Sequence, residues 1–216
     1  MAAKFHYYGA QGRGQQIRFT LVQGGIDFED VSAAFPPAEG QKEKWIELGG
    51  NTTTNVPMLE TADGKTYTQS SAVLRYAARK GSLYPADEET AYAVDNMIAA
   101  VDDFRTAAYK PIFPALMGAP DAASIADFKD NCIPLHFGNF ERILGDKDYF
   151  CGDSVTVADM TMFDVLNNFS FNLFPSVKAN FEKLSAFYDR IAALPNVSAY
   201  MASEKYTALM AFPCLE

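Results

Sequence analysis

The stretch FHYYGAQGRGQQIR, from Phe5 to Arg18, decides the fold. It begins as a strand that ends in two tyrosines, Tyr7 and Tyr8, and it finishes as the first turns of an apolar helix. A loop with three glycines and one arginine, Arg13, joins the two. Ligands of α/β sheets usually bind where the carboxyl end of a strand meets a helix, so these side chains are the first candidates for a site.

The glycines of this loop do not follow a nucleotide-binding pattern. The loop lacks the Gly-x-Gly-x-x-Gly order of dinucleotide sites and the Gly-Lys-Ser/Thr ending of a P-loop. A phenol at the strand end can instead donate a hydrogen bond to an anion near the helix N-terminus. The alternative is that both tyrosines are ordinary strand residues, one pointing inward and one outward.

The residues that follow predict a small α/β domain. After the first helix, IDFEDVSA reads as a second strand and PAEGQKEKWIEL as a short helix that carries the only tryptophan, Trp45. VPMLETADGKTYTQ then predicts a hairpin around an Asp-Gly turn. SSAVLRYAARKG predicts a helix capped by Ser70 or Ser71. The order β-α-β, α, β-β-α predicts a small mixed sheet flanked by helices.

Beyond the acidic, Pro-containing stretch SLYPADEE, apolar residues recur at helical spacing. They fall into four groups: Ala91, Val94, Ile98, Val101 and Ala108; Phe128, Cys132, Leu135 and Phe140; Met160, Phe163 and Leu166; and Phe181, Leu184, Phe187, Tyr188 and Ile191. Thr156 stands three residues before Asp159, the spacing of a capping box at a helix start. We therefore expect an all-helical domain after the α/β domain.

Composition narrows the class of protein. The chain has 216 residues, of which 49% are hydrophobic and 21% charged, as in ordinary globular proteins. Its net charge of −9 argues against nucleic acid as a partner, because such binding rests on Lys and Arg. No apolar run reaches the roughly 18 residues of a membrane helix, and the first residues lack a secretory core, so we expect a cytoplasmic protein without membrane contact.

Cysteine and histidine usage points to a reduced protein without a metal. The three cysteines, Cys132, Cys151 and Cys214, are widely spaced, and reduced thiols fit them best. The two histidines form no cluster with cysteines, so we expect no metal site.

A second cluster of candidates surrounds the predicted hairpin. Pro57 precedes a strand and marks an edge or a sharp turn, with its peptide bond cis or trans, where the Val56 backbone can pair with an extended peptide-like ligand. Gln69 and Ser70 lie at the mouth of the next helix, where backbone N–H groups and a hydroxyl suit a carboxylate. For Ser70 alone, a plain N-cap is the competing interpretation.

Together these motifs resemble the cytosolic glutathione transferases, most closely the tyrosine-type sigma and mu classes, which include glutathione-dependent prostaglandin D synthase. The resemblance covers nearly the whole chain. It is most specific in KFHYYGAQGRGQQIR, in NVPML…YTQSSAVLRYAARKG, in DDF at Asp102 to Phe104, and in GDSVTVADM. It implies a thioredoxin-like glutathione-binding domain at residues 1–82 and an all-helical domain at 83–216 that forms the electrophile pocket and dimer contacts.

The resemblance also implies roles for single residues. Tyr7 matches the tyrosine that activates the thiol of glutathione, which is the co-substrate. The positions that match glutathione contacts are Tyr7, Arg13, Trp45, Asn55, Val56, Pro57, Gln69, Ser70 and Asp103. Asp103 matches an acid that reaches the site across a homodimer interface. The expected contacts of the electrophile are Tyr8, Arg13, Arg105 and Tyr109.

The chain departs from the family pattern in places. Between Trp45 and Val56 the family usually carries a glycine-binding lysine, which is absent here, so Lys42 or Lys44 is the candidate replacement. One turn before the Asp102-Asp103 pair, the prostaglandin synthase has an acidic residue, and this chain has Ala99 at that position.

The resemblance predicts conjugation of glutathione to electrophilic, mostly apolar small molecules, and leaves a peroxidase or isomerase side activity open. A free thiol has a pKa of about 8.5, and a phenol that donates to the thiolate lowers it by about one to two units. The main alternative is a non-catalytic structural or interaction protein on the same fold. A thiol-disulfide enzyme is a second alternative, which needs a cysteine at the first strand–helix junction, where this chain has none.

Overall fold

A computed structural model describes residues 2–50 and 56–216 of the chain. Within these residues no helix combines the length and apolar character that a membrane span needs. The predicted glutathione contact at Asn55 lies outside the described residues.

The chain packs as two compact units. Unit 1 comprises the residues up to Tyr84 together with Pro195–Ala211, and unit 2 comprises Pro85–Leu194 together with Phe212–Glu216. The sequence analysis assigned all residues from 83 onward to a second domain. The packing differs from that assignment at residues 83–84 and at Pro195–Ala211, which belong to unit 1.

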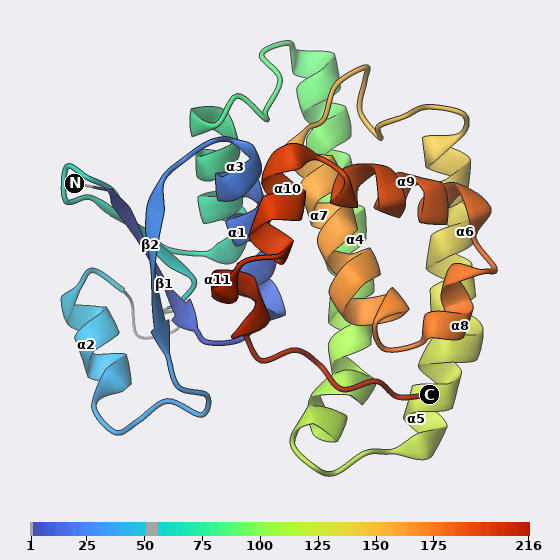
Figure 1. Cartoon of the computed structure of the whole chain (residues 1–216), viewed down its shortest axis with the longest axis horizontal. Helices are drawn as coiled ribbons and strands as arrows, with labels where there is room; N and C mark the ends of the chain where they lie inside the picture. Colours follow the sequence, from blue (N-terminus) through green and yellow to red (C-terminus); the bar gives the residue numbers. More distant parts are fainter. Residues whose placement is uncertain (1, 51–55) are drawn as a thin grey trace. The chain divides into compact units, whose positions relative to one another are not determined.

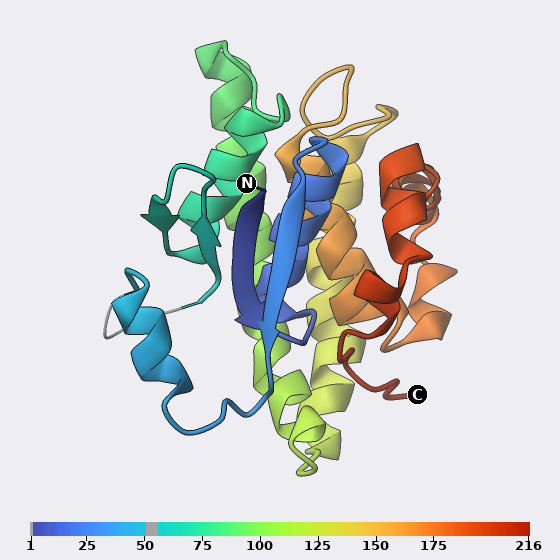
Figure 2. The same ribbon diagram turned by 60° about the vertical axis from the view of Figure 1, so that its left-hand side comes forward.

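Unit 1 contains the predicted mixed sheet, in the order β2-β1-β3-β4. The strands are β1 (Ala3–Tyr8), β2 (Phe28–Ala33), β3 (Met58–Glu60) and β4 (Thr66–Tyr67). β1 runs parallel to β2 and antiparallel to β3, and β3 and β4 form the hairpin. Figure 2 shows β1 and β2 side by side, running in the same direction.

The described residues of unit 1 also form the α-helices α1 (Gln15–Gln23), α2 (Gln41–Glu47), α3 (Ser70–Lys80), α10 (Pro195–Met201) and α11 (Glu204–Thr207). α1 and α3 lie on one face of the sheet and α2 on the other (Figure 1). The ends of α1 and α3 meet at Gly24 and Gly81, where a Cβ on either glycine would lie 2.7 Å from the Cα of the other. α10 packs on α1 through the rings of Tyr200 and Phe19, with centroids 5.7 Å apart.

Unit 2 is all-helical, as predicted. Its helices are α4 (Glu88–Leu116), α5 (Ala122–Asp127), α6 (Ile133–Leu144), α7 (Val157–Leu166), α8 (Pro175–Lys178) and α9 (Glu182–Ala192). Every residue of α7 is buried, and α4 lies beside it (Figure 1). The predicted capping box begins α7, because the Asp159 carboxylate accepts the Thr156 N–H at 2.7 Å.

Leu135 lies in a helix, as its spacing predicts, but not on the buried face with the other apolar residues of its group. It is 75% exposed. A π-helical turn over Phe128–Cys132 precedes α6. This wider turn shifts the register of the helix by about one residue, so Ile133 and Phe137 become the buried positions instead.

Candidate functional site

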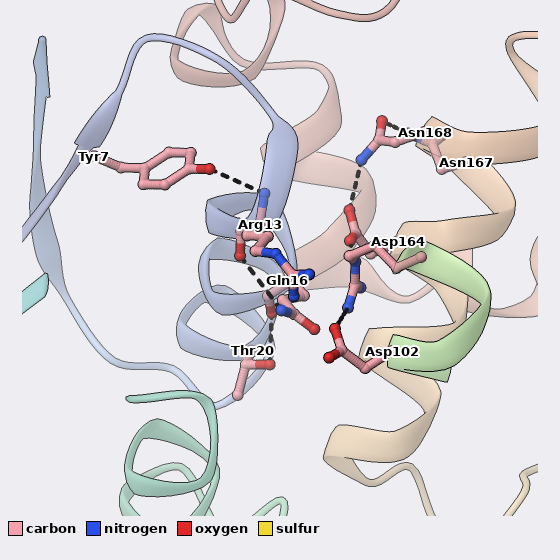
Figure 3. A network of polar contacts seen from close by, with 9 residues as sticks. Tyr7, Arg13, Gln16, Thr20, Asp102, Asp164, Asn167 and Asn168 are labelled. Atoms are coloured by element: carbon pink, nitrogen blue, oxygen red, sulfur yellow. Dashed lines mark hydrogen bonds and ion pairs between the residues drawn. The ribbon is translucent and has the colours of Figure 1, made fainter. Parts of the chain in front are cut away.

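Tyr7 lies at the carboxyl end of β1, where the chain turns into α1. Its hydroxyl oxygen accepts a hydrogen bond from the backbone N–H of Arg13 at 3.1 Å (Figure 3). Arg13 belongs to a 3-10 turn, Gly12–Gly14, that leads directly into α1. The sequence predicted that Tyr7 and Arg13 share this junction, and the structure confirms that they touch.

Burial determines the protonation of Tyr7. The side chain is 8% exposed, and this burial raises the pKa of the phenol above its ordinary value of 10.0. The Arg13 hydrogen bond and the nearby Arg18 charge lower the pKa, but by less than burial raises it. The hydroxyl therefore keeps its proton at neutral pH. Because its oxygen already accepts an N–H, its own O–H is available to donate to an anion.

Arg18 holds the loop that surrounds Tyr7, a role that no sequence motif indicated. The side chain is fully buried and forms an ion pair with Asp30, with Nε 2.5 Å from Oδ2. Its other nitrogens donate to the carbonyls of Ala10 at 2.8 Å and Tyr8 at 3.1 Å. Its guanidinium also lies 5.6 Å from the centre of the Tyr7 ring. One charged side chain thus joins helix, strand and loop.

Tyr8 alternates to the opposite face of the sheet, where α2 packs. Its ring meets Trp45 edge-on at 5.4 Å and Phe35 at 5.1 Å between centroids. Trp45 itself is only 2% exposed. Lys42 and Lys44, the candidate replacements for the missing lysine, are exposed on α2.

The hairpin candidates lie at the start of β3 and of α3. The Val56–Pro57 bond is cis, one of the two forms that the sequence left open, and Pro57 is buried just before β3. Gln69 is exposed and has a φ of 73°, a left-handed conformation that costs a non-glycine residue about 1–3 kcal/mol. Such strain often accompanies a ligand-binding position.

The predicted N-cap of α3 was wrong. Gln69, not Ser70 or Ser71, is the capping residue, and no side-chain hydrogen bond caps the helix. Ser70 is the first helical residue and is half-buried. Its hydroxyl is therefore not needed to cap its own helix.

The candidates on α4 differ in their surroundings. Asp103 is exposed, as an interface residue would be in a single chain. Tyr109 is half-buried and packs edge-on against Phe169 at 5.3 Å. The Arg105 guanidinium lies 5.8 Å from the same Phe169 ring, so Arg105 and Tyr109 share a helix face as predicted.

Arg105 is not available to a small molecule in this structure, contrary to expectation. It is 1% exposed and donates to the fully buried Asp164 at 2.9 Å. Figure 3 shows the network continuing from Asp164 to Asn168, at 2.5 Å. A buried charge needs such partners, so the ion pair between α4 and α7 replaces the predicted role in an electrophile pocket.

No group of three or more His, Cys, Asp or Glu side chains in the described chain is placed to hold a metal ion.

Residues 3–79 match the family "Glutathione S-transferase, N-terminal domain", and residues 102–204 match "Glutathione S-transferase, C-terminal domain". Glutathione S-transferase A2 of Bos taurus is 30% identical over 203 residues, which cover 92% of this chain and 86% of the bovine one. The chain belongs to the glutathione S-transferase family. Glutathione S-transferase alpha-3 of Rattus norvegicus is also 30% identical, over 91% of this chain and 86% of its own.

Solved structures agree with this glutathione S-transferase fold. The glutathione S-transferase of Ascaris lumbricoides superposes with a TM-score of 0.76 at 26% identity, over 94% of this chain and 97% of its own. Prostaglandin synthase D of Nilaparvata lugens superposes with a TM-score of 0.76 at 24% identity, over 93% of this chain and 97% of its own. The Pi-class enzyme of Onchocerca volvulus superposes with a TM-score of 0.80 at 23% identity, over 97% of this chain and 96% of its own. At these low identities the last two structures support the fold alone.

These relatives establish the transferase and its co-substrate, glutathione. They include alpha-class and pi-class enzymes and a prostaglandin synthase, so they do not single out the sigma or mu class that the sequence suggested.

Proposed function

We propose that this glutathione S-transferase activates glutathione through Tyr7 and transfers the sulfur to electrophilic, mostly apolar small molecules. The observation that carries the proposal is the buried Tyr7 hydroxyl, which accepts the Arg13 N–H at 3.1 Å and retains its own proton. A neutral phenol that donates to sulfur stabilises the thiolate over the thiol. With a free thiol pKa of about 8.5, a fall of about one to two units makes much of the bound glutathione nucleophilic at neutral pH.

Glutathione is held, in this proposal, by the positions carried over from the family. The Val56 backbone beside Pro57 pairs with the cysteinyl unit, and Gln69 and Ser70 take the γ-glutamyl carboxylate. The positive φ of Gln69 and the start of α3 without a side-chain cap among the described residues support that assignment, because the first N–H groups of a helix have no partner within the helix and suit an anion.

The remaining contacts follow the same resemblance. Trp45 meets the glycine end of glutathione, with Lys42 or Lys44 in place of the family lysine. Asp103 reaches the site from the partner subunit of a homodimer. The proposed contacts of the electrophile are Tyr8, Arg13 and Tyr109. Tyrosine at the junction and the Gly-Arg-Gly loop favour a sigma- or mu-like class. The family resemblance also suggests a role in detoxification, and the lack of a long apolar run in the sequence favours a cytoplasmic location.

A cysteine-based mechanism has less support. No cysteine stands at the junction of β1 and α1. Burial raises the pKa of the Cys151 thiol to about 12, which leaves it un-ionised at neutral pH and therefore unreactive.

The proposal is tested by mixing the pure protein with glutathione and a panel of electrophiles that includes a chloronitrobenzene, a hydroperoxide and prostaglandin H2. We expect conjugation of at least one apolar electrophile, and an ultraviolet thiolate band when glutathione binds alone. A protein that binds glutathione but shows neither turnover nor this band would be the non-catalytic alternative.

A further inference from the structure

The backbone of Arg13 is held on both sides of its Cα. Its N–H donates to the Tyr7 hydroxyl at 3.1 Å, and its carbonyl accepts from the side-chain amide of Gln16, Nε2, at 3.4 Å. Figure 3 shows these contacts as a chain from Tyr7 through Arg13 to Gln16 and Thr20. The phenol is thereby connected to the first turn of α1.

Gln16 is fixed within α1. Its side chain is 2% exposed, and its own carbonyl accepts from the Thr20 hydroxyl at 2.8 Å. The side-chain oxygen, Oε1, is buried and has no hydrogen-bond partner among the described residues. A buried amide with one unpaired oxygen is less favourable than an apolar side chain of the same length. Packing therefore does not account for a glutamine here, whereas its contact with Arg13 does.

We propose that Gln16 is a positioning residue for thiol activation, because its amide holds the Arg13 carbonyl and so keeps the Arg13 N–H on the Tyr7 hydroxyl. The inference rests on the proposed role of Tyr7 and deepens it. Without the amide, the Arg13 carbonyl loses its side-chain donor, although Gln15 N–H still bonds to Gln11 O at 2.9 Å, and the Arg13 N–H is held less firmly on the phenol oxygen. A hydroxyl that accepts an N–H is also the stronger donor, so Tyr7 then stabilises the thiolate less well.

The test is the Gln16→Met variant, which keeps the side-chain length and removes both the donor and the unpaired oxygen. The thiolate band of bound glutathione, titrated with pH, should move its midpoint up by about half to one unit. Turnover near pH 6.5 should fall by about three- to tenfold and recover at higher pH, while the KM for glutathione changes less than about twofold. The melting temperature should not fall.

Gln15→Met is the matched control. Gln15 is the preceding residue, is fully buried, and also has an unpaired Oε1 among the described residues. Its amide donates to the Tyr200 hydroxyl at 3.4 Å and not to Arg13. Loss of this amide should leave the thiolate midpoint unchanged.

A double variant separates this inference from the proposed function. If Gln16 acts through Tyr7, Gln16→Met should have no further effect in a Tyr7→Phe background. An unmoved midpoint in Gln16→Met, or an equal shift in both backgrounds, overturns the inference while leaving the role of Tyr7 intact. Gln16→Leu provides a second variant without the donor. If neither variant folds, Gln16 serves the fold rather than the thiol, and the inference is wrong.

Discussion

The Tyr7 ring lies so close to the Gly14 backbone that a methyl group there would meet its carbons at 2.5 to 2.9 Å. The glycine therefore sets where the phenol can lie. Other parts of this arrangement, Arg18 on the loop carbonyls and Gln16 on Arg13, likewise act through backbone atoms. Contacts of this kind leave no residue pattern in a sequence, so the sequence analysis found Tyr7 and Arg13 but not the side chains that hold them.

Gly14→Ala should displace the Tyr7 ring. Overpacking of this kind costs about 1–3 kcal/mol of stability, and we expect turnover at neutral pH to fall by about tenfold as well. Gly9→Ala, in the same loop, is the control, because its methyl group would meet Ala33 O at 3.6 Å and Ser32 Cβ at 3.8 Å, ordinary contacts. Thermal melting measures the loss of stability in each variant, and turnover at neutral pH measures the loss of activity. Equal losses in the two variants would contradict the role given to Gly14.

Arg105 shows the limit of sequence reasoning about single residues. Spacing correctly placed it on one helix face with Tyr109, but spacing does not reveal what covers that face. Its partner, Asp164, lies 59 residues further along the chain. The long-range ion pair had no local signal.

At the scale of elements, strands and helices were predictable where pattern and turn chemistry agreed, as in β1, the β3–β4 hairpin and α3. The errors fell at places where backbone geometry departs from the regular repeat. The π-helical turn before α6 moved Leu135 out of the core. At α3, the capping residue is Gln69, which has a positive φ, so Ser70 is the first residue of the helix and not its cap.

That second correction sharpens a prediction for Ser70→Ala. Because Ser70 does not cap α3, its hydroxyl should matter for glutathione and little for stability. Loss of one hydrogen bond to a carboxylate should weaken glutathione binding by about five- to tenfold, measured by calorimetry. The melting temperature should change little, and Ser71→Ala should leave affinity unchanged. A large loss of stability with normal affinity would restore the capping interpretation.

At the scale of the whole molecule, the order of elements predicted both units, because each class of unit has its own hydrophobic period. The return of Pro195–Ala211 to unit 1 was not predictable. Their contacts with the Tyr7 loop are backbone hydrogen bonds, from Gln11 N–H to Met210 O at 3.0 Å and from Met210 N–H to Gly9 O at 2.9 Å. Such bonds leave no residue pattern, and the ring contact between Tyr200 and Phe19 joins parts of the sequence that are far apart.

The proposed dimer makes a prediction about mixed subunits. If Asp103 acts on the partner's site, a heterodimer of a Tyr7→Phe chain and an Asp103→Asn chain contains one site with both groups intact. Mixing the two variants, with exchange of subunits, should raise turnover at low glutathione above that of either alone. Sedimentation should give a dimer at micromolar concentration. No gain on mixing, with exchange verified, would place Asp103 in its own subunit's site or in none.

The central claim is that the Tyr7 hydroxyl stabilises the glutathione thiolate. Tyr7→Phe keeps the ring and removes the hydrogen bond to the charged form of the thiol, so the pKa of bound glutathione must rise. Because burial holds the pKa of Tyr7 above 10.0, the phenol itself does not ionise in the neutral range and cannot account for the titration.

The most direct measurement is the ultraviolet thiolate band of bound glutathione, titrated with pH in wild type, Tyr7→Phe and Tyr8→Phe. The account predicts that Tyr7→Phe raises the midpoint by about one to two units and lowers turnover at neutral pH by about ten- to a hundredfold, with partial recovery at higher pH. Tyr8→Phe should leave the midpoint in place. A midpoint that Tyr7→Phe leaves unmoved would contradict the account. A shift of the midpoint in Tyr8→Phe alone would mean that Tyr8, and not Tyr7, activates the thiol of glutathione.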